Sequence, residues 1–319
     1  MDIVCLGELL VDFFPLQIGK ALTDVSSFRP VPGGAPANVA VAVAHLGCKS
    51  AFIGKVGDDE FGHWLEKILR YEGVETGCLR FDPIVRTTLN FISQPDANSY
   101  TCLFYRNPGA DTCLRPDELD RQILSEAHAF HFGLLSLTDE PSRSATREAI
   151  NIARSGGSLI SFDVNYRPTL WNSPEEARET ALEFAREVDL LKVNEIELRL
   201  LTGSNQLSSA IYLVDQGPEL CLVTLGPQGC FYQTKFAGRL VPAYQVDTVD
   251  ATGCGDAFIA GILSKLVTLK NWKAVLHSTR LEEFVRYANA VGAITALTQG
   301  VIPALPNADQ VDRFLNLSA

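Results

Sequence analysis

The stretch from Val246 to Val267 carries the residues whose types and spacing most clearly suggest chemistry. Polar turn residues lead into Gly253-Cys-Gly-Asp256, and an apolar helical pattern follows. A helix that begins at these glycines presents unpaired backbone N–H groups and the positive end of its dipole, which together suit a phosphate group. An ordinary helix start rich in Gly and Asp is the alternative.

Asp256 gives this helix start a further meaning. A carboxylate would repel an anion that is only bound there. Its presence is explained if Asp256 removes a proton from an attacking hydroxyl while the N–H groups hold the developing phosphoryl charge. The segment is therefore interpreted as a candidate site of phosphoryl transfer.

Polar residues also follow several predicted strands. The strands at 3–7, 158–163, 189–193 and 221–225 are followed by Asp12, by Asn165 and Arg167, by Asn194 and Glu197, and by Gly226. In a parallel sheet these strand ends lie along one edge, beside the crevice in which open α/β sheets bind ligands. We therefore expect these side chains to share one site.

Asn194 and Glu197 lie three residues apart at a predicted helix start, so they share one face. An amide and a carboxylate there would orient a hydrated Mg²⁺ that bridges nucleotide phosphates. Alternatively, Glu197 is a solvated acid favoured by the helix dipole. Arg167 has two interpretations as well, an anchor for a phosphoryl oxygen or a partner in a surface salt bridge.

The segment Phe28–Asn38 precedes a helical run at 39–46. Gly33 and Gly34 permit an unusual turn, and Asn38 is expected to cap the helix while facing a ligand. A capped loop without a ligand is the alternative.

The chain alternates strands and helices over most of its length, which predicts a mostly parallel sheet with helices on both faces. A strand is expected at 50–56 and helices at 60–71, 140–155, 175–187 and 281–297. The β-rich runs Thr87–Ser93 and Tyr100–Tyr105, separated by a turn signal at 94–98, predict a hairpin. We expect one α/β domain over residues 1–319, with a small discontinuous β lid built from about 12–31 and 84–107.

Composition limits the classes of partner. The 319 residues carry a net charge of -11, which argues against nucleic acid and anionic membrane surfaces. The eight cysteines are scattered without a Cys-x-x-Cys pair, as is typical of free thiols in a reducing cytoplasm. Glu8 and Asp12 interrupt the first apolar run, so no signal peptide is predicted. A soluble, cytoplasmic protein is expected.

Three blocks of this sequence together resemble the ribokinase-like (PfkB) carbohydrate kinases. They are Gly33-Gly-Ala-Pro-Ala-Asn38, Asn194-Glu-Ile-Glu197 and Asp250-Ala-Thr-Gly-Cys-Gly-Asp256. The resemblance extends across essentially the whole chain. Within the family, the segments 104–111, 163–167 and 288–306 look most like those of fructokinases.

The resemblance implies a three-layer α/β/α sandwich and ATP-dependent phosphorylation of a sugar hydroxyl, most closely D-fructose to D-fructose 6-phosphate. Kinases for ribose, 2-keto-3-deoxygluconate or a nucleoside remain alternatives with the same chemistry. A non-catalytic sugar or nucleotide sensor of the same fold is an alternative from another class. A nicotinamide-dependent oxidoreductase is disfavoured because the glycine fingerprint is missing.

The resemblance also implies roles for individual residues. Asp256 would be the general base, the backbone of Gly253, Cys254, Gly255 and Asp256 the anion hole, and Arg167 would approach the transferred phosphoryl group. The sugar would be held by Asp12, Gly33, Gly34, Asn38, Arg86, Arg106, Asn165 and Asp256. The nucleotide would be bordered by Asn194, Thr224, Gly226, Gly229, Gly253, Gly255 and Asn289. Mg²⁺ would be held through water by Asn194 and Glu197, and K⁺ would bind near Asp250 and Thr252. The lid would form a homodimer interface.

Cys254 departs from the family pattern, which usually has alanine between the two glycines. A thiol at a helix N-terminus can have a lowered pKa and become reactive. Thiol-alkylating reagents are therefore predicted to inactivate the protein, with protection by ATP. A buried, inert thiol is the alternative.

Overall fold

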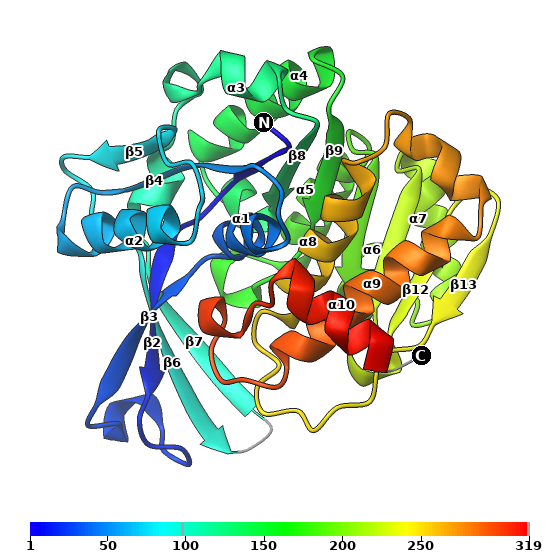
Figure 1. Cartoon of the computed structure of the whole chain (residues 1–319). Coiled ribbons are helices and arrows are strands. Elements are labelled where there is room, and N and C mark those ends of the chain that lie inside the picture. Colours follow the sequence, from blue (N-terminus) through cyan, green and yellow to red (C-terminus); the bar gives the residue numbers. More distant parts are fainter. Residues whose placement is uncertain (97–98, 318–319) are drawn as a thin grey trace.

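The computed structural model describes residues 1–96 and 99–317, so the expected turn at 94–98 lies partly outside the described residues. A nine-stranded sheet forms the centre of the molecule, in the order β13-β12-β11-β10-β9-β8-β1-β4-β5 (Figure 1). Its strands are β1 (Ile3–Leu6), β4 (Ser50–Gly57), β5 (Leu79–Asp82), β8 (Ala129–Gly133), β9 (Leu159–Asp163), β10 (Leu190–Asn194), β11 (Leu220–Thr224), β12 (Cys230–Gln233) and β13 (Gly238–Val241). The pairs from β5 to β11 are parallel, and β12 and β13 add an antiparallel edge.

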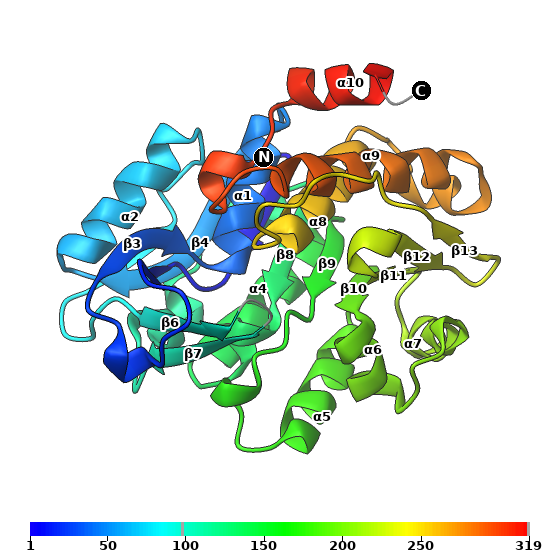
Figure 2. The ribbon, with the colours of Figure 1, turned by 90° about the horizontal axis from the view of Figure 1, so that it is seen from below.

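Helices cover both faces of this sheet and complete a three-layer arrangement (Figure 2). They are α1 (Ala35–His45), α2 (Glu60–Tyr71), α3 (Arg121–Ser125), α4 (Ser142–Ser155), α5 (Pro174–Ala185), α6 (Glu195–Thr202), α7 (Ala210–Gln216), α8 (Cys254–Leu266), α9 (Arg280–Thr295) and α10 (Ala308–Leu317). Buried side chains of α1, α2, α8, α9 and α10 form one core cluster, and those of α3 to α7 form the other. The predicted parallel sheet with two helical layers is confirmed.

Helix α2 illustrates how the sequence determines a helix. Asp59 caps it by accepting a hydrogen bond from the Gly62 backbone N–H (2.9 Å). Leu65 and Leu69 are buried on its inner face, and charged side chains occupy the outer face, as in an amphipathic surface helix. Helix α8 is buried along most of its length because it packs between α1 and α9.

A second sheet of four strands projects from one end of the main body (Figure 1, lower left). It contains β2 (Leu10–Pro15), β3 (Phe28–Gly33), β6 (Leu89–Asp96) and β7 (Ser99–Tyr105), in the order β3-β2-β6-β7. Phe13 on β2 stacks on Phe91 of β6 with ring centroids 4.7 Å apart. Phe13 also forms a T-shaped contact with Phe61 of α2, with ring centroids 5.8 Å apart, and this contact joins the second sheet to the main body.

Two sequence-based placements need correction. Asp12 does not lie in the loop after β1, because the chain turns at residues 7–9 and enters β2, where Asp12 pairs with Val31 and Asn90 of the neighbouring strands. The first helix begins at Ala35 rather than after Asn38, since Pro36 occupies its first turn and Gly34 is the N-cap. No helix in the described part of the chain is long and apolar enough to cross a membrane.

Candidate active site

The ends of β9, β10 and β11 bring predicted site residues to one edge of the central sheet. These strands are consecutive and parallel, so the residues that follow them are neighbours, as the strand-end argument requires. Asn165 and Arg167 follow β9, Asn194 ends β10, and Gly226 follows β11. The start of α8 reaches the same edge, because Gly255 lies against the Lys192 side chain of β10.

The backbone at the start of α8 is open. Gly253 is its N-cap, with a φ of 78°, and no side chain in the described part of the chain caps the helix. The N–H groups of Gly255 and Asp256 have no acceptor within the helix, as in the first turn of any α-helix. Unpaired N–H groups and the positive end of a helix dipole are suited to an anion.

Steric constraints within the protein also favour glycine at both of these positions. A side chain at Gly253 would have to adopt the left-handed region and would overlap Val301. A Cβ at Gly255 would lie 3.0 Å from Lys192 Nζ. The close approach of a ligand, which the sequence suggested, is therefore only one of the reasons that favour glycine here.

Asp256 is buried and lies in the first turn of α8. Its Oδ2 accepts a hydrogen bond from Asn38 Nδ2 at 2.8 Å, and no partner of its Oδ1 is found among the described residues. Burial raises the pKa of Asp256 to about 6, and the Asn38 hydrogen bond opposes part of that rise. A carboxylate with this pKa is ionised at neutral pH and can accept a proton from a hydroxyl.

Asn38 does not cap a helix as expected. It lies in the first turn of α1, and its backbone N–H donates to Gly34 O. Its side-chain amide instead holds Asp256, which is 218 positions away in the sequence. Asn38 Oδ1 is buried without a hydrogen-bond partner, which is unusual for a buried polar atom and suits a donor supplied by a ligand.

Asp12 and Asn90 form a second polar pair on the second sheet. They are direct neighbours on β2 and β6, and Asn90 Nδ2 donates to Asp12 Oδ1 at 2.7 Å. Gly33 lies directly against the Asp12 carboxylate. Burial raises the pKa of Asp12 to about 6, although Asn90 and Arg167 lower it. Asn90 Oδ1 is another buried acceptor without a partner.

Arg167 connects the two polar pairs electrostatically. Its positive charge lowers the pKa of both Asp12 and Asp256, against the larger effect of burial. It makes no salt bridge with any described residue, and its guanidinium contacts only the carbonyl oxygens of Asn165 and Tyr166. The salt-bridge interpretation is therefore wrong. Asn165 has a φ of 40° and is the one described non-glycine residue with a positive φ, a conformation often found at functional sites.

Asn194 and Glu197 form a reciprocal capping box at the start of α6. Asn194 Oδ1 accepts from the Glu197 N–H at 2.9 Å, and Glu197 Oε2 accepts from the Asn194 N–H at 2.8 Å. Glu197 Oε1 accepts from the Tyr166 N–H. Glu197 is 1% exposed, so the solvated-acid interpretation is wrong. Burial raises the pKa of Glu197, and Lys192 lowers it.

The predicted nucleotide residues lie around the end of β11 and beyond it. Thr224 Oγ1 donates to Val193 O of β10. Gly226 and Gly229 bound the turn between β11 and β12. Asn289 is buried in α9 and donates to the carbonyl oxygens of Val241 and Pro242, so its amide fixes the chain that leaves β13.

Asp250 fixes the loop before α8. Its carboxylate accepts from the N–H and hydroxyl of Thr252 and from the N–H of Gly300. Burial opposes ionisation, but these hydrogen bonds outweigh it and lower the pKa of Asp250. The backbone carbonyl oxygens of this loop remain candidate cation ligands.

The expectation of a lowered thiol pKa at Cys254 is wrong. Burial, together with the nearby carboxylates Asp250 and Asp256, raises the pKa of Cys254 to about 12. The effect of the helix dipole is therefore outweighed, and the thiol is expected to be inert.

The two arginines predicted for the sugar side differ in position. Arg86 is exposed and precedes β6. Arg106 is buried, and its guanidinium binds Asp111 at 2.7 Å, Thr138 Oγ1 at 2.8 Å and Leu135 O at 2.9 Å. Arg106 therefore fixes the chain beyond β7, and most of its donors are already used.

Asn90, Lys192 and Glu8 are not among the residues predicted from the sequence. Lys192 interrupts an otherwise apolar buried strand, and that interruption was a usable signal. Its Nζ lies 2.8 Å from Asp163 Oδ2. Glu8 is buried, with Oε1 bonded to the Ala35 N–H and Oε2 without a partner. Asn90 gave no signal, because its importance depends on its neighbour across the sheet.

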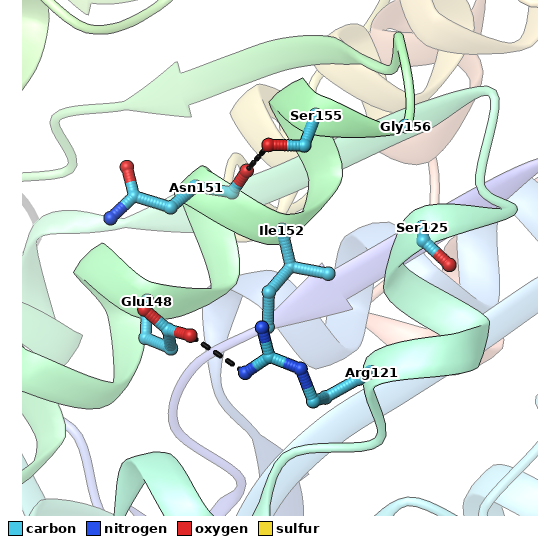
Figure 3. A pocket seen from close by; sticks show the side chains of 7 residues that line it. All are labelled: Arg121, Ser125, Glu148, Asn151, Ile152, Ser155 and Gly156. Atoms are coloured by element: carbon cyan, nitrogen blue, oxygen red, sulfur yellow. Dashed lines mark hydrogen bonds and ion pairs between the residues drawn. The ribbon is translucent and has the colours of Figure 1, made fainter.

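A surface hollow of about 360 Å³ lies elsewhere, between α3 and α4 (Figure 3). Its polar contacts are an ion pair between Arg121 and Glu148 and a hydrogen bond from Ser155 to the backbone of Asn151. These are ordinary surface interactions, and none of the predicted site residues lines the hollow.

Comparison with protein families matches residues 1–308 to the model described as pfkB family carbohydrate kinase. Probable fructokinase-2 of Arabidopsis thaliana is 43% identical over 317 residues, which cover 99% of this chain and 96% of the relative. Fructokinase-1 of Oryza sativa subsp. japonica is 44% identical over 315 residues, covering 98% and 97%.

Solved structures share the fold. Fructokinase of Xylella fastidiosa with bound ATP has a TM-score of 0.91 and 30% identity, covering 99% of this chain and 98% of that chain. A fructokinase double mutant of Vibrio cholerae O395, with fructose, ADP and a potassium ion bound, has a TM-score of 0.88 and 32% identity, covering 98% of each chain. Aminoimidazole riboside kinase of Salmonella enterica, complexed with aminoimidazole riboside and an ATP analog, has a TM-score of 0.85 and 34% identity, covering 99% and 100%. The predicted three-layer kinase fold is thereby confirmed.

Proposed function

The chain belongs to the pfkB family of carbohydrate kinases, and from this premise we propose that it transfers the γ-phosphoryl group of ATP to D-fructose and forms D-fructose 6-phosphate. Members of this family phosphorylate carbohydrates with ATP. The choice of fructose is supported by the fructokinase relatives, which match nearly the whole chain.

The observation that carries the mechanism is the position of Asp256. It is buried at the start of α8, with one oxygen held by Asn38 and the other without a partner among residues 1–96 and 99–317. A sugar hydroxyl beside Oδ1 would lose its proton to Asp256 as its oxygen attacks the γ-phosphorus. The bond to the ADP oxygen breaks, and the N–H groups of Gly255 and Asp256 stabilise the negative charge on the transferred group.

The sugar is held by acceptors that have no donor among the described residues. Asn38 Oδ1 and Asn90 Oδ1 are buried and unpartnered, and Asp12 lies beside Asn90. Sugar hydroxyls supply donors to such atoms. Gly33 lies against Asp12, and we propose that Gly34 and Asn165 border the same region. Arg106 supports it indirectly by fixing the chain beyond β7, and Arg86 is exposed. The raised pKa values of Asp12 and Asp256 reflect burial that is compensated when a polar substrate binds.

Arg167 is the proposed anchor of the phosphoryl group. Its charge lies near both carboxylates, yet it forms no salt bridge with a described residue. Around the end of β11, Thr224, Gly226 and Gly229 border the nucleotide, and Asn289 fixes the adjoining chain.

Asn194 and Glu197 fit a hydrated Mg²⁺ rather than a directly bound one. Their oxygens are hard donors, but Glu197 is buried and each of its oxygens already accepts a backbone hydrogen bond. Water-mediated contact is therefore the mode these residues allow. When bound, Mg²⁺ neutralises charge on the nucleotide phosphates.

The loop at Asp250 and Thr252 is the proposed site of a monovalent cation, as supported by the potassium-bound Vibrio cholerae fructokinase. Replacing K⁺ by Li⁺ in the assay should lower turnover if such a site exists, and equal turnover would contradict it.

The second sheet is proposed to act as a lid over the sugar and as a dimer interface within a single kinase domain. Leu103 and Tyr105 on β7, together with Leu16 and Ile18 after β2, are exposed, and such apolar residues on one small sheet favour association. Sedimentation equilibrium should give a dimer that Leu103→Lys converts to a monomer. A monomeric native protein would contradict this interface.

We also propose a cytoplasmic location. The eight cysteines are free thiols, and free thiols are typical of a reducing compartment.

The substrate is tested by ADP release from Mg·ATP, without sugar and then with fructose, ribose, glucose, 2-keto-3-deoxygluconate or aminoimidazole riboside. Stimulation by fructose, with a product identified as the 6-phosphate, is expected. Stronger stimulation by the riboside would favour the function of the Salmonella enterica relative. Nucleotide binding without any stimulation would favour a sensor.

A further inference from the structure

We propose that Lys192 is a positioning residue for phosphoryl transfer: fixed by Asp163 beneath Gly255, its ammonium group supplies a permanent positive charge to the floor of the anion site at the start of α8. The inference rests on the proposed kinase function. It adds a residue that contacts neither sugar nor nucleotide and acts through the helix start above it.

The position of Lys192 is tightly fixed. Lys192 on β10 and Asp163 on β9 are direct neighbours in the parallel register. Nζ lies 3.0 Å from Asp163 Oδ1 and 2.8 Å from Oδ2, and both side chains are buried. The ammonium lies against Gly255, since a Cβ there would be 3.0 Å from Nζ. The lysine therefore occupies the space that a side chain at Gly255 would need.

The local charges show why a lysine is useful here. Asp163 contacts the Lys192 ammonium group, and the charges of Glu197 and Asp256 also act on it, so the positive charge of one lysine is set against three carboxylates. Without the lysine, the buried charges beside Gly255 would be those of carboxylates, and a triphosphate would have to approach them with the help of Arg167 and the helix N–H groups alone. Because the charge is held in a low-dielectric interior, it acts more strongly than a solvated surface charge.

A second buried lysine provides a matched comparison. Lys55 on β4 is also buried in the central sheet and pairs with carboxylates, Glu118 at 2.8 Å and Asp82 at 3.2 Å. It is bonded to Cys113 O as well, and none of these partners belongs to the phosphoryl site. Lys55 is therefore a control for a buried, paired lysine outside the proposed phosphoryl site.

The test is steady-state kinetics of Lys192→Met, Asp163→Asn/Lys192→Met and Lys55→Met, with folding checked by thermal denaturation. We expect Lys192→Met to lower kcat on the order of 10- to 100-fold, with the KM for fructose nearly unchanged. The double variant removes both charges and should remain slow. Lys55→Met should lose stability but keep kcat.

The double variant decides between the two roles, even if Lys192→Met alone does not fold. Wild-type kcat in the double variant would show that Lys192 only neutralises Asp163, and this would overturn the inference. Turnover of fructose by the wild-type protein is the internal reference. If the wild-type protein does not turn over fructose, the proposed substrate is contradicted and the role of Lys192 is not. In that case, calorimetry with a non-hydrolysable ATP analogue and ADP still tests the lysine. Lys192→Met should weaken binding of the ATP analogue more than binding of ADP. An equal loss of affinity for the two nucleotides would overturn the inference.

Discussion

Two aspartates at helix starts, Asp59 of α2 and Asp256 of α8, have opposite environments. Asp59 is the N-cap, and its carboxylate accepts hydrogen bonds from the Gly62 N–H and from the N–H and hydroxyl of Thr87. Burial opposes its ionisation, but these bonds outweigh burial and lower its pKa. Asp256 lies one turn further in, caps nothing, and has its pKa raised to about 6 by burial.

This difference assigns Asp59 to the stability of the fold and Asp256 to the proposed chemistry. A carboxylate that caps a helix satisfies the backbone and contributes to folding. A buried carboxylate beside an uncapped helix start leaves both its own oxygen and the backbone N–H groups for a ligand. Substitutions at α8 should therefore change turnover, and substitutions at α2 should change stability.

The largest effect is expected for Asp256→Asn, which keeps the shape of the side chain but removes the base. kcat should fall on the order of 10²- to 10⁴-fold, with ATP affinity and melting temperature largely retained. Stopped-time assays and calorimetry measure these quantities. Turnover within a few-fold of the native enzyme would exclude Asp256 as the base.

Gly255→Ala should have the next largest effect. The new Cβ would lie 3.0 Å from Lys192 Nζ, so the helix start or the lysine has to shift. A fall in kcat of about 10- to 10³-fold is expected, as for loss of one anion-hole donor. Gly77→Ala, at an exposed turn, is the control and should be nearly silent. Equal kinetics of the two variants would argue against the anion site.

Asp59→Ala should destabilise the protein by about 0.5–2 kcal/mol, the usual cost of losing an N-cap, with kcat unchanged. Urea unfolding at pH 7 measures this loss. Because the folded pKa of Asp59 is lowered, its contribution is present above an unfolded pKa of about 3.9 and is lost as the pH falls through the folded value. The difference between variant and native protein should shrink at low pH. A lower kcat in a stably folded Asp59→Ala variant would contradict the assignment of Asp59 to stability alone.

The smallest effect is expected at Cys254. Since burial raises its pKa to about 12, iodoacetamide at neutral pH should leave activity nearly unchanged. Inactivation that ATP prevents and that Cys254→Ala abolishes would restore the reactive-thiol hypothesis.

The sequence predicted what local rules determine. The bounds of α2 agree with the prediction because a capping aspartate and an amphipathic stripe define the helix. The adjacency of β9, β10 and β11 followed from strand and helix alternation. The edge strands β12 and β13 were missed because short antiparallel strands carry little periodic signal.

Pairwise contacts between distant segments could not be predicted in the same way. Asn38 was expected to cap a helix, but it holds Asp256 across the molecule. Asp12 was expected in a loop, but it forms a pair with Asn90 on the second sheet. The position of Lys192 beneath Gly255 depends on how α8 packs on the sheet. Residue type and spacing indicated the chemistry, whereas the partners depended on tertiary packing.

The most direct test of the account is the pH dependence of kcat/KM for fructose, which reports ionisations of the free enzyme. Asp256 must be ionised to accept the proton, so kcat/KM should fall as the pH drops below about 6, the pKa that burial gives both Asp256 and Asp12. Asp12→Asn removes the ionisation of Asp12 and should leave a shallower fall, and Glu8→Gln removes the ionisation of Glu8, whose pKa burial raises to about 7; the fall that persists in both variants belongs to Asp256. A profile that stays flat from pH 7 to below pH 5 would contradict the role of Asp256 as the base.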